Sequence, residues 1–112
     1  VMQEAARAAG PYAIVGPIIH FMDGPDEVMT DGVRFNARNF PGFFPRVEVP
    51  ARPGAPLAFT EVDVVNGCCL MAHRRVFEAI GGFDASLFIY HDETDFCLRA
   101  RARDLRAAVF SR

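Results

Sequence analysis

Several features that would mark a function class are missing from this chain. Its 112 residues include no lysine, all twelve basic residues are arginines, and the net charge is −2. Nucleic-acid-binding domains usually have an excess of positive charge, so this balance argues against a nucleic-acid partner. No apolar run approaches the ~18 residues that a membrane-spanning helix requires, and no signal peptide is visible.

Cysteine is also scarce. The three cysteines, Cys68, Cys69 and Cys97, are odd in number and form no Cys-x-x-Cys pair. This set predicts neither a disulfide framework nor a zinc site, and cysteines in apolar runs are usually small buried hydrophobic residues. We therefore expect all three in the core, and a reducing, cytoplasmic location for the protein.

What is present fits a single globular domain. The length allows one domain at most, and hydrophobic residues make up 51% of the chain. The sequence opens at Val1 inside a helical pattern and closes at Arg112 directly after a strand-like run. We expect residues 1–112 to be one fragment of a longer protein.

Hydrophobic patterning predicts alternating helices and strands, which indicates the α/β class. Helices are expected at Met2–Ala9, Arg74–Ile80 and about 92–103. Strands are expected at Tyr12–Val15, Ile18–Met22, Phe59–Val65, Cys68–Ala72 and Arg106–Phe110, with a break at Gly16-Pro17 and a turn at Asp23–Asp26. Asn66-Gly67 has two interpretations, a hairpin turn between flanking strands or a glycine where the backbone approaches a ligand.

The stretch 29–56 holds five of the eight prolines and many phenylalanines. Proline excludes regular helix and central strand, so we expect a long loop rich in proline and phenylalanine. Two interpretations are open: a surface loop pinned by its aromatic residues, or one wall of a binding cleft.

Three carboxylates, Asp92, Glu93 and Asp95, crowd into the first turn of the predicted helix near the end of the chain. Acidic residues here often cap a helix and complement its dipole. A metal site or a catalytic base are the alternatives, since a helix N-terminus holds a carboxylate ionised and oriented. Asp95 stands four residues before Arg99, the spacing of an ion pair along a helix.

Spaced motifs then make the sequence resemble a known family. They are Val65-Asn66-Gly67-Cys68-Cys69-Leu70-Met71, Arg75-Val76-Phe77, Gly81-Gly82-Phe83-Asp84, Phe88–Tyr90 and the run from Asp92 to Arg99. In this order and spacing they resemble the second half of a family 2 glycosyltransferase catalytic domain, most closely the rhamnosyltransferase-like enzymes of bacterial cell-envelope polysaccharide biosynthesis. Ala13–Pro17 with Asp23-Gly24 resembles an earlier segment of the same family.

The resemblance implies a partial GT-A fold, with a mixed, mostly parallel sheet flanked by helices. The chain would be the acceptor-side half of that domain. The half that supplies the nucleotide-binding strands and the Asp-x-Asp motif has no counterpart here. A divalent metal, Mg or Mn, is therefore implied for the parent enzyme with its ligands outside this chain, and no metal site is expected within it.

The resemblance also implies site residues. The family's Glu-Asp pair falls on Asp92-Glu93 in swapped order, which assigns the catalytic base to Glu93 with Asp92 as the alternative. Asn66, Gly67, Cys68 and His91 are implied to contact substrate. We expect structural roles for His20 and His73. The arginines from Arg99 to Arg106 should form a solvated face, with contact to an anionic acceptor or a membrane surface as the alternative.

The implied activity is sugar transfer with inversion, from a nucleotide-diphosphate sugar to a glycan or lipid-linked acceptor. An acceptor in a lipid would place the enzyme at the inner face of the membrane as a peripheral protein. The isolated fragment is expected to be inactive. The alternative is a non-catalytic interaction or dimerisation module descended from the same fold, in which exposed strand edges would favour a homo-oligomer.

Overall fold

A computed structural model describes residues 1–35, 47 and 54–111. Its elements, in chain order, are α1 (Met2–Ala8), β1 (Tyr12–Pro17), β2 (Ile19–His20), β3 (Val28–Thr30), β4 (Ala58–Val62), β5 (Met71–Ala72), α2 (Arg74–Ile80), α3 (Asp92–Arg101) and β6 (Arg106–Ser111). The three predicted helices and most of the predicted strands are confirmed, with ends shifted by a few residues.

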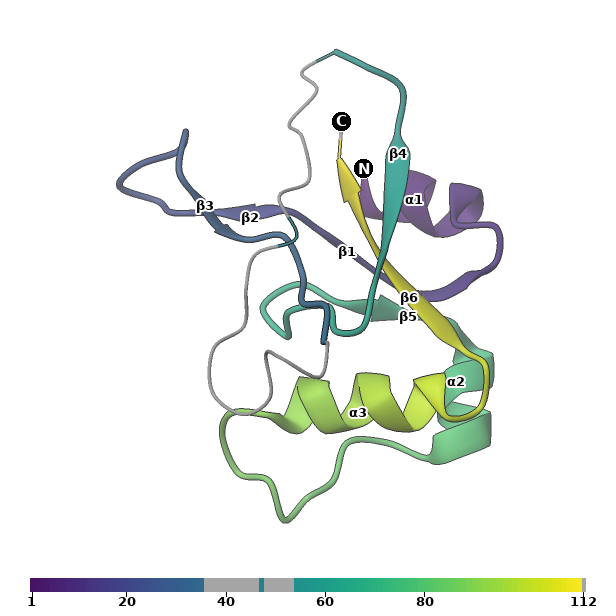
Figure 1. Ribbon diagram of the computed structural model, residues 1–112. Helices are drawn as coiled ribbons and strands as arrows, with labels where there is room; N and C mark the ends of the chain where they lie inside the picture. The colour runs from purple at the N-terminus through teal and green to yellow at the C-terminus, as the bar shows by residue number, and fades with distance from the viewer. Residues whose placement is uncertain (36–46, 48–53, 112) are drawn as a thin grey trace.

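The main sheet has four strands in the order β4-β6-β1-β5 (Figure 1). Only β1 and β6 pair in parallel, whereas β4 pairs with β6 and β5 pairs with β1 in antiparallel fashion. The α/β class and the mixed sheet are confirmed. The expectation of a mostly parallel sheet is wrong for the described residues, because an alternating pattern predicts a strand but not its direction.

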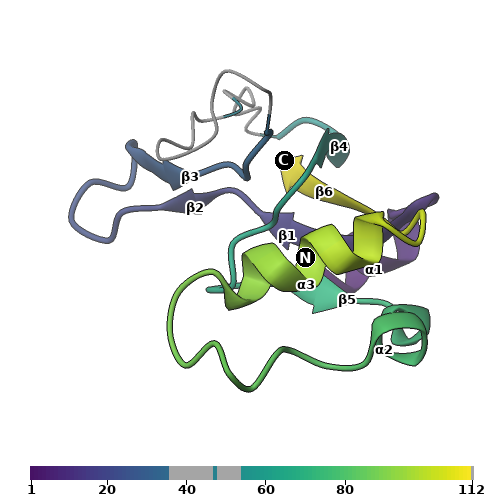
Figure 2. The ribbon, with the colours of Figure 1, turned by 60° about the horizontal axis from the view of Figure 1, so that its bottom comes forward.

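Helices cover both faces of this sheet. On one face, Ala5 and Ala9 from the segment of α1 pack with Val15 and Phe110. On the other, α2 and α3 contribute Val76, Phe96, Cys97 and Ala100 to a larger core with Ile14 and Val109. Neighbouring strand residues therefore point into different cores, and the three layers are visible in Figures 1 and 2. No helix in the described part of the chain is long and apolar enough to cross a membrane.

A two-stranded hairpin of β2 and β3 projects from the main sheet (Figures 1 and 2). The predicted turn at Asp23–Asp26 closes it, and the Phe21 N–H donates to the Glu27 carbonyl over 3.0 Å. The long loop expected at 29–56 begins with short extended pieces, since β3 runs through Thr30 and Val33 forms an isolated bridge with Val64. The remainder of that expectation, including Phe40, Phe43 and Phe44, lies outside the described residues.

The predicted break at Gly16-Pro17 is also wrong, since β1 continues through both residues. A Cβ atom on Gly16 would lie 2.3 Å from Val65 Cγ1 and 2.7 Å from the Cys69 carbonyl oxygen. Glycine here therefore permits close packing against a crossing segment. It does not end the strand.

The hairpin interpretation of Asn66-Gly67 is wrong. The strands before and after it, β4 and β5, lie at opposite edges of the sheet, so the connecting segment 63–70 crosses between edges. Long-range pairing of β4 with β6 and of β5 with β1 decides this topology, and a local turn signal carries no information about it.

Candidate functional site

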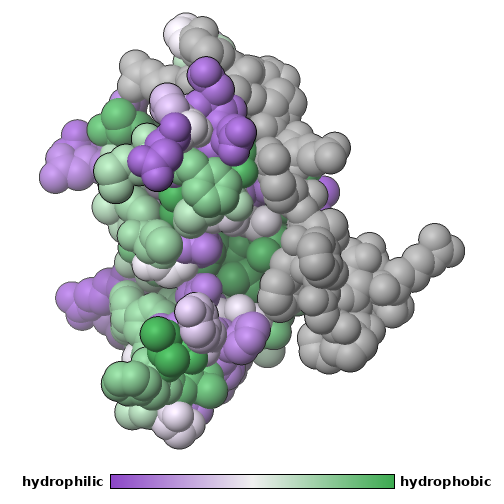
Figure 3. Space-filling model, turned by 90° about the vertical axis from the view of Figure 1, so that its left-hand side faces the viewer, coloured by the Kyte–Doolittle hydropathy of each residue, from purple (hydrophilic) through white to green (hydrophobic). Residues whose placement is uncertain are grey.

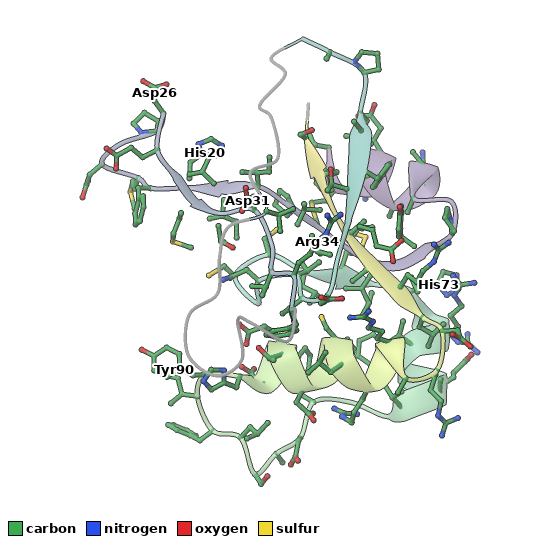
Figure 4. All side chains as sticks on the ribbon, in the orientation of Figure 1. His20, Asp26, Asp31, Arg34, His73 and Tyr90 are labelled. Atoms are coloured by element: carbon green, nitrogen blue, oxygen red, sulfur yellow. The ribbon has the colours of Figure 1, made fainter. Side chains whose placement is uncertain are left out.

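A cavity of about 310 Å³ opens at the start of α3. It is lined by residues from β3 and the segment after it, from the 63–70 crossing segment, and from the start of α3: Met29, Thr30, Gly32, Val33, Val64, Asn66, Tyr90, His91, Glu93 and Thr94. We call this the site cavity. Figure 3 looks onto this side of the molecule, and Figure 4 labels Tyr90 near its lower edge.

The site cavity brings together three residues that the sequence singled out, Asn66, His91 and Glu93. Gly67 lies directly behind it, because a Cβ atom built there would be 3.5 Å from the Glu93 Cβ. Asp92 and Cys68 are not among the lining residues. The described start of the 29–56 stretch, Met29 to Val33, walls the cavity, which agrees with the cleft-wall interpretation of that stretch.

The start of α3 differs from an ordinary capped helix. His91, the N-cap residue, has left-handed backbone angles of φ 63° and ψ 1° and makes no side-chain capping hydrogen bond. Tyr90 before it also has a positive φ of 65°. Bulky residues rarely adopt this conformation, so two in a row produce a sharp change of direction directly before the carboxylates.

Glu93 is half-buried on the cavity wall. Burial raises the pKa of its carboxyl above the ordinary value, and the neighbouring Asp92 raises that pKa further. A backbone N–H at the helix start and the nearby His91 oppose the shift. A carboxylate whose pKa is raised toward neutrality is a stronger proton acceptor, which is the property a general base requires.

The third carboxylate has a structural role, as the spacing predicted. The Arg99 Nε donates to Asp95 Oδ2 over 2.7 Å. The other guanidinium nitrogens of Arg99 donate to the carbonyls of Ile80 and Gly82, each over 2.9 Å. The expected solvated face is therefore wrong for Arg99, which ties α3 to the end of α2.

Two further arginines of the expected solvated face also bind their own chain. Arg101 pairs with Asp63, and Arg106 pairs with Glu61 at 3.1 Å while its guanidinium lies 5.5 Å from the Tyr12 ring centroid. They join α3 and β6 to the edge of the sheet at β4. The spacing of these arginines does not predict their acceptors, because the acceptors lie about 40 residues earlier in the chain.

The residues around Gly67 form a turn. The Asn66 Oδ1 accepts a hydrogen bond from the Cys68 N–H over 2.8 Å, which holds the backbone beside Glu93. Cys68 is exposed and Cys69 partly buried, so the expectation of a core position is wrong for Cys68 and confirmed only for Cys97. Burial raises the pKa of the Cys97 thiol to about 11, which leaves it protonated at neutral pH.

Two aspartates that the sequence did not single out for this region hold the cavity wall. Asp63 Oδ2 accepts from the Phe35 N–H over 2.6 Å, and Asp31, fully buried, accepts from the Val47 N–H over 3.0 Å. Both carboxylates order the backbone that follows β3. The signal that could have found them is weak, since single aspartates after short apolar runs are common in turns.

Tyr90, Thr30 and Thr94 also line the site cavity and were not predicted as site residues. His73, expected to be structural, is confirmed in that role, because its Nδ1 accepts from the Arg75 N–H at the start of α2. His20 is exposed in β2 and does not line the cavity. Within residues 1–35, 47 and 54–111, no group of three or more His, Cys, Asp or Glu side chains could hold a metal ion.

Comparison with known proteins gives one curated relative. The chain is 40% identical over 57 residues to the low-salt glycan biosynthesis hexosyltransferase Agl10 of Haloferax volcanii, an archaeal protein. The match takes in 51% of this chain and 19% of the length of that relative. No family model and no solved structure matches. The relative is a hexosyltransferase, and it is archaeal, whereas the sequence motifs had pointed to bacterial enzymes.

Proposed function

We propose that this chain is the acceptor-side part of a glycosyltransferase that moves a sugar from a nucleotide-diphosphate donor to a glycan or lipid-linked acceptor. The observation that carries the proposal is Glu93, a half-buried carboxyl with a raised pKa on the wall of the site cavity. The likeness to a hexosyltransferase supplies the reaction class. The finer assignment, an inverting family 2 enzyme of the GT-A fold, rests on the motifs from Val65 to Arg99.

In the proposed reaction, Glu93 removes the proton from the acceptor hydroxyl. The oxygen then bonds to the anomeric carbon of the donor sugar from the face opposite the nucleotide diphosphate, whose bond to that carbon breaks. The configuration at the anomeric carbon inverts. Asp92 beside Glu93 acts through its charge, because a neighbouring carboxylate raises the pKa of the base.

The other proposed site residues have distinct tasks. Asn66 and His91 line the cavity and would contact substrate, and Gly67 lies beside the Glu93 side chain, at a distance where a Cβ atom would make ordinary van der Waals contact. Cys68, which is exposed on the turn that follows, would contact substrate only through its backbone or outside the cavity. The divalent metal, Mg or Mn, would be held by ligands outside this chain, and no step assigned to these residues depends on it.

The cytoplasmic location, peripheral membrane association with a lipid-linked acceptor, and formation of a homo-oligomer belong to this proposal as expectations. One observation favours the second candidate, a non-catalytic interaction module. The connector before α3 exposes apolar side chains, with Phe88 96% and Ile89 64% accessible. A partner, or another part of a longer protein, could cover such a surface.

Transfer by the full-length protein that contains this chain tests the proposal. With a panel of nucleotide-diphosphate hexoses and the host's glycans, Glu93→Gln should lower kcat by about 10²–10⁴-fold with little change in donor binding. Asp92→Asn should have a smaller effect, and Glu78→Gln, which removes an exposed carboxylate on α2, should have none.

Three results would change the assignment. Loss of activity in Asp92→Asn with an active Glu93→Gln would move the base to Asp92. Full activity in both variants would overturn a catalytic role for this helix start. A full-length wild-type protein that binds no nucleotide sugar and transfers none would favour the interaction module.

A further inference from the structure

Tyr90 occupies an unusual position in the site cavity. It lines the cavity together with Glu93, yet its side chain is 74% exposed. Figure 4 shows the ring projecting from the segment before α3, on the side of the molecule from which the β2–β3 hairpin also projects. One face of the aromatic ring is therefore available to a molecule that enters the cavity.

The rest of the lining combines two kinds of chemistry. Thr30, Asn66 and Thr94 offer hydroxyl and amide groups that donate and accept hydrogen bonds, while Met29, Val33 and Val64 are apolar. A ligand that satisfies both must carry hydroxyl groups around an apolar surface. A pyranose ring has this character, because its hydroxyls lie at the rim and its axial C–H bonds form an apolar face that packs on aromatic rings.

The backbone fixes where the Tyr90 ring lies. Tyr90 and His91 both have positive φ, at 65° and 63°, a conformation in which glycine would be unstrained. The start of α3 holds this geometry through the Asp95 N–H, which donates to the His91 carbonyl over 2.9 Å. The Tyr90 ring is thereby presented beside Glu93 by a short, constrained segment directly attached to a helix.

We propose that Tyr90 is the platform for the acceptor: the apolar face of an acceptor pyranose ring packs on the Tyr90 ring, with one hydroxyl directed at Glu93. The assignment to the acceptor rests on the proposed function, since the ring beside the base must carry the attacking hydroxyl. The site would therefore require an acceptor whose attacking hydroxyl is carried by a pyranose ring. It would discriminate against acyclic polyols with the same number of hydroxyls.

The composition of the chain makes this testable by fluorescence. It contains no tryptophan and only two tyrosines, Tyr12 and Tyr90. Tyr12 lies against Phe59 on the α1 side of the sheet, with ring centroids 6.1 Å apart. In the Tyr12→Phe variant all tyrosine emission comes from Tyr90, so a titration reports directly on this ring.

The probes are methyl β-D-glucopyranoside, methyl α-D-mannopyranoside, sorbitol and UDP-glucose. At least one methyl glycoside should change Tyr90 emission saturably, whereas sorbitol, which has hydroxyls but no ring, should not. In titrations followed by NMR on the otherwise unchanged chain, Tyr90→Ala should weaken glycoside binding by about 2- to 10-fold, the usual worth of one aromatic contact. Tyr90→Phe, which keeps the ring face, should bind like the wild type.

The inference is overturned if no glycoside binds, if sorbitol binds equally, or if Tyr90→Ala binds as tightly as the wild type. A response to UDP-glucose but to neither methyl glycoside would place the donor sugar on Tyr90 and overturn the acceptor assignment. These outcomes are separate from failure of the proposed function. If a full-length protein bound glycosides through Tyr90 but transferred no sugar, the proposed transferase activity would be refuted, and the sugar-binding role of the Tyr90 ring would stand.

Discussion

Two helices of this protein begin at a histidine, and the two starts are built differently. His73 before α2 has extended backbone angles, φ −65° and ψ 143°, and its side chain caps the helix by accepting from Arg75 N–H. His91 before α3 has left-handed angles and makes no side-chain cap. The first arrangement stabilises a helix, whereas the second turns the chain directly before Glu93, the carboxylate that lines the site cavity. Acidic residues at a helix start are therefore not evidence of capping by themselves.

The largest effect on stability is expected at Gly32, which lines the site cavity. It has φ +86°, and a Cβ atom there would lie 2.8 Å from Val62 Cγ1 and 3.0 Å from Val109 Cγ1. Gly32→Ala should lower the free energy of unfolding by about 3 kcal/mol or more, through overpacking together with the backbone penalty. Gly82→Ala, after α2, is the control, because nothing lies within 4 Å of its Cβ position. Chemical denaturation measures the free energy of unfolding of both variants. Equal values would contradict the close packing of Gly32 against Val62 and Val109.

The next effect separates two ion pairs of identical spacing. Arg99 on α3 bonds to Asp95 and to two carbonyls at the end of α2, Ile80 and Gly82, while Arg74 on α2 pairs with the exposed Glu78. Arg99→Ala should cost about 1–2 kcal/mol, because Asp95 and two backbone carbonyls lose a charged donor at a partly exposed site. Arg74→Ala should cost about 0.3–0.5 kcal/mol, as an exposed helix pair does. If thermal unfolding gives the same shift for both, Arg99 does not hold α3 against α2.

Substitutions of the two histidines should distinguish the two kinds of helix start by their effect on stability. His73→Ala removes the cap and should destabilise the chain by about 0.5–2 kcal/mol. At His91 the left-handed backbone penalises every side chain, so His91→Gly should be more stable than His91→Ala by about 1 kcal/mol. Urea unfolding measures the free energy of unfolding of the three variants. If His91→Ala were more stable than His91→Gly, the backbone at position 91 would not keep its left-handed conformation in the variants.

The smallest effect concerns pH. Because burial raises the pKa of Glu93 above its ordinary value of 4.5, the folded state binds this proton more tightly than the unfolded state does. The contribution of this tighter proton binding to the free energy of unfolding is complete below pH 4.5. It is lost as the pH rises through the pKa of Glu93 in the folded state. Relative to the wild type, Glu93→Gln should therefore gain stability as the pH rises from below 4.5 to neutrality, by a small amount.

Melting temperatures of the two proteins across this pH range measure the trend. Glu78→Gln, which changes an exposed carboxylate on α2 in the same way, is the control. Parallel melting curves for Glu93→Gln and the wild type at every pH would show that Glu93 ionises as it does in the unfolded chain.

Local patterns predicted those parts of the fold that depend on local order. Hydrophobic patterning predicted the helices that became α1 and α3, and the Asp95–Arg99 spacing predicted their ion pair. Each of these features joins residues within one or two helical turns, which is the distance over which periodicity carries information.

What failed depends on contacts between distant residues. Asn-Gly predicted a hairpin, but β4 pairs with β6 and β5 with β1, so the turn crosses the sheet. The prediction for Cys68 failed for a local reason: it stands in an apolar run yet is exposed, on a turn where its N–H donates to Asn66 Oδ1.

The candidate site divides in the same way. The motifs predicted that Glu93, Asn66 and His91 belong together, and the structure brings them to one cavity. The role of Glu93 as a base stays a prediction. The Tyr90 ring could not be predicted, because its position depends on left-handed backbone angles that no residue preference signals for tyrosine.

The position of β6 has a consequence for folding order. It lies between β4 and β1 and pairs with both, so the centre of the sheet is assembled from strands about 50 and 95 residues apart. Closing such long loops precedes any reward from pairing, which makes nucleation slow. Until β6 is in place, the described β1 and β4 have no strand between them with which both can pair. We therefore expect the helix α1 and the α2–α3 pair to form early, and the sheet, together with the cavity that depends on it, to form last.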